Sequence, residues 1–151
     1  MPSRYANAFG LSARLHHVGI AVRSIASMHP DLASTFDPIQ KVRVAFVAMH
    51  DLTLELVEPV GEDSPVQRSL EEGVKLLHIC YEVDRLEPAL KSARSSGYAM
   101  IRAPAPAEAF DHRRIAWVYH RELGLVELLE REPANRSRAV TIAVATDPGA
   151  P

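Results

Sequence analysis

Apolar and polar positions alternate with a period of two in the segment 75–83, KLLHICYEV. That period is typical of a β-strand, in which neighbouring side chains point to opposite faces of the sheet. One face carries Leu77, Ile79, Tyr81 and Val83, and the other carries His78, Cys80 and Glu82. We therefore expect the first face to pack against the core and the second to carry the chemistry.

The same alternation occurs in three more segments, which form matching pairs. LHHVGIAV has the form of KLLHICYEV, with His17 in the place of His78. LTLELVE matches LVELLE, with Glu55 in the place of Glu127. The His and the Glu are 38 residues apart in the first half of the chain and 49 apart in the second. Agreement in order, residue type and strand parity indicates a duplicated unit whose first copy is shortened.

The first half carries a short helix and a hairpin. Segment 24–36 is a poor helix, because Ser24 can cap it but Pro30 interrupts it. Segment 41–48, KVRVAFVA, is rich in β-branched residues and predicts a strand. The turn MHD leads from it directly into the strand that bears Glu55, so these two strands are expected to form a hairpin.

The two halves are joined by the segment 59–73, PVGEDSPVQRSLEEG, which predicts a connecting helix. Ser64 followed by Pro65 is typical of a helix start, with Pro at the first helical position. Gly73 ends this helix.

A longer helix follows the strand that bears His78. Asp84 is expected to cap it, Glu87 to complete a capping box, and Gly97 to end it. The apolar stripe of this helix consists of Leu86, Ala89, Leu90 and Ala93. The rest of the half is expected to form a short strand at 98–102, a Pro-broken loop at 103–109, and strands at 114–120 and 124–130.

Composition narrows the class of protein. The chain has 151 residues, 47% of them hydrophobic, which is enough for one ordinary domain or two small fused modules. A net charge of −2 gives no electrostatic reason to expect a nucleic-acid or membrane partner. Cys80 is the only cysteine, so no intrachain disulfide can form and a reducing, cytoplasmic location is expected. No apolar run is long enough for a membrane span or a secretory signal.

Four segments in this order, LHHVGIAV, LTLELVEP, LLHICYEV and GLVELLE, resemble the metal-bearing strands of the vicinal oxygen chelate superfamily, which includes glyoxalases, bleomycin resistance proteins and dioxygenases. The resemblance covers residues 14–131. The run EPVGEDSPV, together with LLHICYEV, resembles the methylmalonyl-CoA epimerase branch more than the glyoxalase or dioxygenase branches.

The resemblance implies an α+β fold in which two βαβββ modules form one curved, cup-like mixed sheet with helices outside. We place the modules at 14–60, the shortened copy, and at 74–131, with the connecting helix at 61–73 between them. Residues 1–13 are expected to be a flexible arm. Residues 132–151 form a tail whose β-like run at 140–146 is either a disordered end or a strand added to a sheet edge.

The resemblance also implies that His17, Glu55, His78 and Glu127 bind one divalent metal ion. Two imidazoles and two carboxylates suit Co, Zn, Ni or Mn and leave room for two oxygens of a substrate. Ring-cleaving dioxygenases use two histidines and one carboxylate, so the additional Glu55 argues against that chemistry.

The polar residues outside this set of four are expected to have no part in metal binding. Strand parity places His16 opposite His17, as a surface or packing residue, and Cys80 is expected to line the cavity rather than bind metal. Glu58 and Glu130 fall on the face opposite Glu55 and Glu127 and are expected to be solvated. The remaining polar side chains are placed in an exposed turn or on a solvated rim that would suit coenzyme A phosphates: His50, His112, Arg113 and Arg114.

The first module departs from the family pattern, because segment 24–40 is too short for the full helix and additional short strand that relatives carry. One wall of the pocket is then missing or supplied by another chain, and a homodimer is expected.

A divalent ion that chelates two substrate oxygens acidifies the C–H bond beside a carbonyl. The expected function is therefore a metal-dependent epimerase of the methylmalonyl-CoA epimerase type acting on a small acyl thioester, with Glu127 as base. Inversion needs a second base, but segment 41–48 contains no Asp or Glu. The alternatives are a glyoxalase-type lyase, an enzyme for a carrier-bound acyl group, or a small-molecule binding or resistance protein without catalysis.

Overall fold

The structure of the chain, a computed structural model, describes residues 3–132, so the β-like run predicted at 140–146 lies outside the described residues. Those residues form one eight-stranded sheet with three α-helices and a single turn of 3₁₀-helix. In chain order the elements are β1 (Arg14–Ala21), α1 (Ile25–Met28), β2 (Thr35–Asp37), β3 (Val42–Met49), β4 (Leu52–Pro59), α2 (Pro65–Glu71), β5 (Leu76–Val83), α3 (Leu86–Ser95), β6 (Ala99–Pro106), η1 (Glu108–Phe110), β7 (Arg114–His120) and β8 (Gly124–Glu130).

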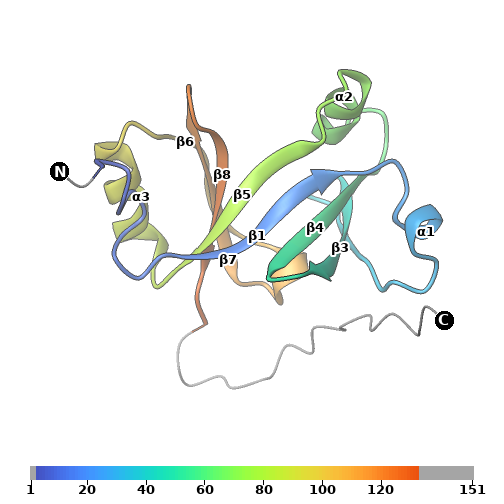
Figure 1. The fold of residues 1–151 in the computed structure, drawn as a ribbon, viewed down its shortest axis with the longest axis horizontal. Coiled ribbons are helices and arrows are strands. Elements are labelled where there is room, and N and C mark those ends of the chain that lie inside the picture. The colour runs from blue at the N-terminus through green and yellow to red at the C-terminus, as the bar shows by residue number, and fades with distance from the viewer. Residues whose placement is uncertain (1–2, 133–151) are drawn as a thin grey trace.

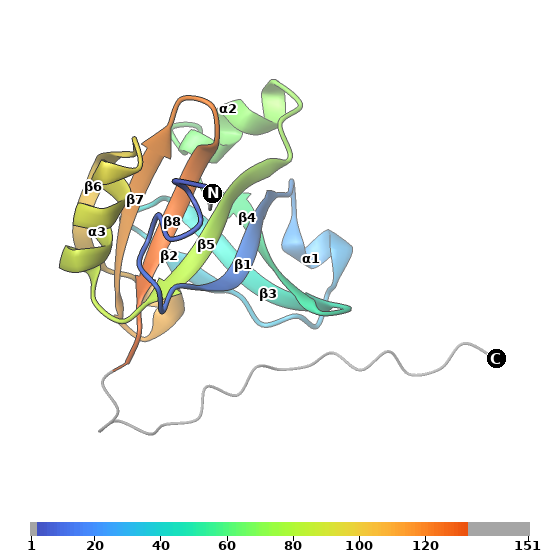
Figure 2. The same cartoon turned by 60° about the vertical axis from the view of Figure 1, so that its left-hand side comes forward.

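The sheet curls into a half-barrel, and its two halves have the same topology (Figure 2). The strand order is β2-β3-β4-β1-β5-β8-β7-β6. Strand β1 runs parallel to β4, β5 runs parallel to β8, and the antiparallel pair β1–β5 joins the halves at the centre. Helices α1 and α3 lie outside the sheet at opposite ends of the molecule (Figure 1). The predicted α+β, cup-like fold with outer helices is therefore confirmed.

The main apolar core lies between α3 and the outer face of the second half of the sheet. Leu86, Ala89 and Ala93 of α3 are buried there, as the helical spacing predicted. Residues 3–13 pack over the same helix instead of extending as an arm, because Ala8 and Phe9 are buried in this core. The outer face of β5 joins it through Val83 and the half-buried Tyr81, whose ring centroid lies 5.1 Å from that of Phe9.

The first half contains a helix and four strands like the second, but its helix and the strand that follows the helix are much shorter. Helix α1 is a single turn with the predicted cap, since the Ser24 side chain accepts a hydrogen bond from the backbone N–H of Ser27. The chain then forms β2, a three-residue strand that pairs with β3. The expectation that this strand is missing was wrong, because three residues suffice for pairing at the sheet edge.

Strand β6 is longer than predicted, extending through Pro104 to Pro106. A proline removes one backbone donor, and this does little harm in an edge strand, where one side of the backbone has no partner strand. The predicted loop at 103–109 is therefore mostly strand, followed by the η1 turn.

A glutamate from the last strand of each half binds the N-terminus of that half's helix. The carboxylate of Glu58 accepts a hydrogen bond from the backbone N–H of Ile25 at 2.7 Å, and that of Glu130 accepts one from Leu86 at 3.0 Å. A carboxylate is favourable at a helix N-terminus because the first N–H groups have no partner within the helix. These two glutamates are partly buried structural groups, which corrects the expectation that they are solvated.

The predicted capping box of α3 is also wrong. The N-cap residue is Arg85 and its side chain makes no capping hydrogen bond. Asp84 forms an ion pair with Arg131, and Glu87 forms one with Arg114. The glutamate of β8 supplies the capping oxygen in their place.

Within residues 3–132, none of the helices has the length and apolar composition needed to cross a membrane.

Candidate metal centre

Four side chains from the four central strands converge inside the cup. His17 comes from β1, Glu55 from β4, His78 from β5 and Glu127 from β8. The Nε2 atom of His17 lies 3.2 Å from Oε2 of Glu55 and 3.2 Å from Oε2 of Glu127. The Nε2 atom of His78 lies 3.1 Å and 3.2 Å from the same two oxygens, and the two Nε2 atoms are 3.2 Å apart. All four side chains are buried.

The register of the sheet produces this convergence and repeats between the halves. On β1, the residue two places after His17 is Gly19, which pairs with Glu55 of β4. On β5, the residue two places after His78 is Cys80, which pairs with Glu127 of β8. The same offset in both parallel strand pairs brings each glutamate beside its histidine, and the central β1–β5 pair then joins the two couples into one cluster of four.

The geometry of the cluster fits a single divalent ion. Ligands about 2.0–2.2 Å from a metal lie roughly 2.8–3.1 Å apart in octahedral and roughly 3.3–3.6 Å apart in tetrahedral geometry, and the separations of 3.1–3.2 Å fall between these ranges. The Oε2 atom of Glu127 is buried, and within the described residues its polar neighbours are the Nε2 atoms of His17 and His78 at 3.2 Å, neither of which forms a well-aligned hydrogen bond to it. A buried carboxylate oxygen of this kind is costly without a cation, and a donor set of two imidazoles and two carboxylates suits Zn, Co, Ni or Mn.

Without a bound ion, protons on the imidazoles offset the negative charge of the carboxylates in the cluster. Burial alone lowers the pKa of His78, but the Glu127 and Glu55 carboxylates outweigh it and raise that pKa to about 9. Burial alone raises the pKa of Glu55, but hydrogen bonds from His17 and His78 lower it to about 2. The pKa of His17 is raised and that of Glu127 lowered for the same reasons. At neutral pH the metal-free cluster therefore holds a protonated His78 beside an ionised Glu55.

One side of the cluster is closed by aromatic rings. Phe110 stacks on the His17 ring with centroids 5.8 Å apart and planes at 22°, and Phe46 meets the same ring edge-on at 5.5 Å. Trp117 meets the His78 ring edge-on from the cavity wall, with centroids 4.8 Å apart. These contacts hold the orientation of both imidazoles, and Phe46 and Phe110 cover the His17 ring.

The other side of the cluster opens into a cavity of about 260 Å³. Its walls come from strands of both halves and from α2. It is lined by Gln40, Val42, Val44, Glu55, Val57, Pro65, Val66, Ser69, Leu77, His78, Ile101, Arg102, Trp117, Leu125 and Glu127. The arrangement would suit a buried ion that is accessible from one side, next to a mostly apolar chamber for a small ligand.

Residues 16–117 match the family model described as the Glyoxalase/Bleomycin resistance protein/Dioxygenase superfamily. The chain belongs to this superfamily. It is 35% identical over 133 residues to the uncharacterized protein YqjC of Bacillus subtilis, covering 78% of this chain and 91% of that protein. It is 27% identical over 128 residues to an ethylmalonyl-CoA/methylmalonyl-CoA epimerase of Cereibacter sphaeroides, covering 76% and 96%.

A solved structure of methylmalonyl-CoA epimerase from Mycobacterium tuberculosis superimposes with a TM-score of 0.66. The two chains are 24% identical, and the superposition covers 79% of this chain and 88% of that one. At this level of identity the superposition supports the fold alone. The predicted superfamily is confirmed, and methylmalonyl-CoA epimerases are among its relatives.

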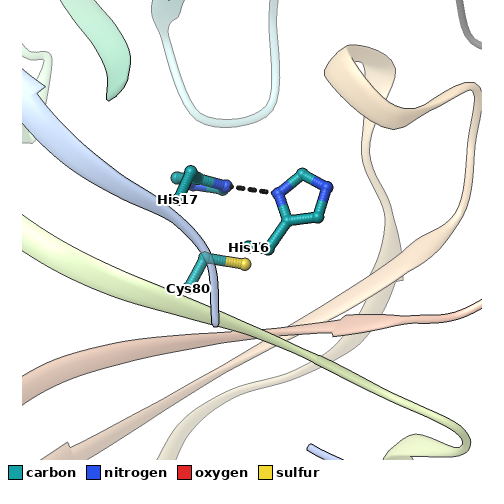
Figure 3. Close-up of side chains that lie close together, drawn as sticks. All are labelled: His16, His17 and Cys80. Atoms are coloured by element: carbon teal, nitrogen blue, oxygen red, sulfur yellow. Dashed lines mark hydrogen bonds between the residues drawn. The ribbon is translucent and has the colours of Figure 1, made fainter. Parts of the chain in front are cut away.

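His16 does not lie where strand parity placed it. Leu15 pairs with Tyr81 and His17 with Cys80, so His16 is an additional residue in β1, a β-bulge. The bulge turns His16 to the same side as His17, and the Nδ1 atoms of the two rings are 2.8 Å apart (Figure 3). Burial, and then the neighbouring His17, lower the pKa of His16. Cys80 is fully buried beside the two histidines (Figure 3).

Gly19 is a second residue that the sequence analysis missed. It lies directly beneath the ring of His78, with which it pairs across β1 and β5. The available signal was a glycine inside a strand pattern, which often marks a close approach of another group to the backbone.

The predicted basic rim is largely occupied by structural ion pairs. Arg113 pairs with Glu82, and Arg114 bridges Glu87 and Glu130. His112 and His50 are exposed, as expected. Arg102 is different, because it lines the cavity and has no carboxylate partner within residues 3–132.

Proposed function

We propose that this protein is a metal-dependent enzyme that moves a proton at the carbon beside a thioester carbonyl, most closely an epimerase of the methylmalonyl-CoA type. The observation that carries this proposal is the convergence of His17, Glu55, His78 and Glu127 on one point that faces a cavity. Residues of this kind would hold one divalent ion through two nitrogens and two oxygens. When bound, such an ion withdraws charge from a substrate carbonyl and acidifies the neighbouring C–H bond.

The chain's own residues would handle the proton and the substrate. Glu127 lies at the cavity wall on β8, a central strand, and is the carboxylate that we assign as base. Val42, Val44 and Leu125 line the same chamber and would exclude water from the reacting carbon. Holding the carboxylate and the substrate in a fixed orientation contributes to the rate because little reorganisation is then needed.

Arg102 supports an anionic substrate. It is the one Lys or Arg that lines the cavity within residues 3–132, and no carboxylate neutralises it. A guanidinium in this position would bind a carboxylate or phosphate of the substrate through charge-assisted hydrogen bonds. The acyl-CoA named for the Cereibacter sphaeroides relative carries both kinds of group, which agrees with this assignment.

A second candidate function is a glyoxalase-type lyase that acts on a hemithioacetal. It is favoured because the cavity wall, within the described residues, carries no carboxylate beyond the two of the cluster. Within the described part of the chain, Glu55 and Glu127 are the only carboxylates on the cavity wall, and β3 contributes Val42 and Val44 there. Inversion of a carbon centre needs a group that accepts the proton on one face and a group that donates a proton on the other, whereas one carboxylate can move a proton between adjacent carbons.

Deuterium exchange tests the proposal. Metal-loaded protein is incubated in deuterated water with one epimer of methylmalonyl-CoA, and in parallel with a hemithioacetal and a carrier-bound thioester. We expect deuterium at the carbon beside the thioester carbonyl of methylmalonyl-CoA, and Glu127→Gln should slow its appearance by roughly 100-fold or more. Glu122→Gln is the control, because Glu122 is an exposed residue in the turn before β8.

The outcomes separate the candidates. Turnover of the hemithioacetal alone would replace the epimerase by the lyase. No exchange with any of the three substrates, together with tight binding of an aromatic or drug-like ligand, would show a binding or resistance protein instead.

A further inference from the structure

The residue before each candidate metal histidine is bulged out of the central strand pair. On β1 the additional residue is His16, and on β5 it is Leu77, since Gly19 pairs with His78 and Ile20 with Leu76. The two bulges correspond under the duplication, but they carry different chemistry. Leu77 lines the cavity beside His78, whereas His16 presents a ring nitrogen to His17.

The contact between the two neighbouring histidines is specific. The Nε2 atom of His17 faces the two glutamates, and its Nδ1 atom lies 2.8 Å from Nδ1 of His16. Within residues 3–132, this is the only hydrogen bond that Nδ1 of His17 makes. The ring of His16 is half-buried and meets Phe110 edge-on, with centroids 5.8 Å apart and planes at 85°.

The chemistry of imidazole assigns a direction to this hydrogen bond. A neutral imidazole has one N–H and one bare nitrogen, so a histidine that binds an ion through Nε2 must carry its proton on Nδ1. That N–H needs an acceptor, and metal-binding histidines usually donate it to a carboxylate, a backbone carbonyl or water. Here the available acceptor is the bare Nδ1 of His16, which leaves the proton of His16 on Nε2.

We infer that His16 is a positioning residue, which accepts the Nδ1–H of His17 and thereby holds the Nε2 lone pair of His17 toward the four-residue cluster. This inference rests on the proposed metal site. It assigns to the bulge in β1 a role that the bulge in β5 does not have, because Leu77 offers no acceptor and no hydrogen bond to Nδ1 of His78 is present in residues 3–132.

Two substitutions separate the hydrogen bond from packing. His16→Phe keeps an aromatic ring against Phe110 but removes the acceptor. His16→Asn places an amide oxygen near the position of Nδ1 and restores an acceptor. His50→Asn, which removes an exposed histidine in the β3–β4 turn, controls for the loss of an imidazole. Thermal unfolding of each variant shows whether it folds.

Zinc affinity and the tautomer of His17 are the readouts, the latter from ¹⁵N chemical shifts of the zinc-loaded protein. We expect the wild type to carry the His17 proton on Nδ1. His16→Phe should weaken zinc binding by about 10-fold to 100-fold, and His16→Asn should recover most of the loss. His50→Asn should bind zinc as the wild type does.

The outcomes distinguish a failure of this inference from a failure of the proposed metal site on which it rests. If the wild type binds no zinc, the proposed metal site fails. If it binds zinc and folded His16→Phe binds equally well with an unchanged His17 tautomer, the site stands and the positioning role is wrong. Two zinc ions per chain, the second of which Cys80→Ser abolishes, would make His16, His17 and Cys80 a second metal site and overturn the inference.

Discussion

The backbone of Gly19 lies against the imidazole ring of His78 so closely that no side chain fits between them. A Cβ atom at Gly19 would lie 2.5 Å from Nδ1 and 2.6 Å from Nε2 of His78. Such distances are well below van der Waals contact, so any larger residue must move the ring or separate β1 from β5. The glycine thus creates the space that His78 occupies within the cluster.

Gly19→Ala should therefore weaken metal binding by about 10-fold or more, the usual scale when a group that orients a metal ligand is lost. Zinc titration of the folded variant measures this. Gly10→Ala is a matched control, because a Cβ atom at Gly10 would meet no other atom. Its φ of +97° is unfavourable for alanine, so this variant tests backbone strain alone. Gly10→Ala should lower stability without changing zinc affinity. Equal zinc affinities for the two variants would show that the space above Gly19 is not needed.

The helix-capping carboxylate on β8 makes the stability of the fold pH-dependent. The Arg114 guanidinium lowers the pKa of Glu130 below its ordinary value of 4.5, with burial opposing. A carboxyl group whose pKa is lower in the folded than in the unfolded state stabilises the fold at any pH above its unfolded-state pKa. This stabilisation is lost as the pH falls through the folded-state pKa. At pH 7, Glu130→Gln should cost about 0.5–1 kcal/mol, and the cost should shrink below about pH 4.5.

Urea unfolding with a chelator present, at several pH values, measures this difference. Glu72→Gln is the control, because Glu72 forms an exposed pair with Arg68 on α2 and should change stability by less than about 0.5 kcal/mol. A constant difference between wild type and Glu130→Gln from pH 7 to pH 3 would contradict the assigned pKa shift.

Metal binding should release protons. At pH 7 the pKa of His78, which its two glutamate neighbours raise to about 9, keeps this imidazole protonated in the metal-free protein. An imidazolium cannot bind a metal ion, so at least one proton must leave, and affinity should rise from pH 6 to pH 9. Calorimetric titration in two buffers of different ionisation enthalpy counts the protons. Identical heats in both buffers would mean that His78 is already neutral.

Arg102 should contribute to substrate binding rather than to the chemical step. Arg102→Met should raise KM for methylmalonyl-CoA by about 10-fold or more with little change in kcat, because a charge-assisted hydrogen bond is worth about 1.5–3 kcal/mol. Arg94→Met, which removes an exposed arginine on α3, is the control and should leave both constants unchanged. A fall in kcat at constant KM would assign Arg102 a different role.

Duplication and strand alternation matched His17 with His78 and Glu55 with Glu127, and the resemblance to the superfamily implied that the four residues share one site. The structure brings the four side chains together, and metal binding there stays a prediction. Alternation failed at His16, since a bulge adds one residue and changes the face on which a side chain lies. For Glu58 and Glu130 alternation gave the correct face, but the expectation that they are solvated was wrong, since they bind helix N-termini 33 and 44 residues away in the chain. Long-range contacts of this kind leave no periodic signal.

Edge strands were the other source of error. Strand β2 has only three residues, too few for a pattern, and the prolines of β6 are tolerated because the strand lies at the edge of the sheet. A poor helix interrupted by Pro30 was predicted over 24–36, and α1 is shorter, a single turn that ends at Met28, before the proline. Helix positions could thus be predicted from local sequence, whereas helix capping and the extent of the outer strands depend on residues distant in the chain.

Metal stoichiometry tests the central claim most directly. Protein purified without added metal is loaded with zinc or cobalt, passed through a desalting column and analysed for bound metal, alongside the double variant His17→Ala, His78→Ala. We predict one ion per chain for the wild type and none for the double variant, with the eight-stranded fold retained by circular dichroism. A folded double variant that still binds one ion per chain would contradict the assignment of this cluster as the metal site.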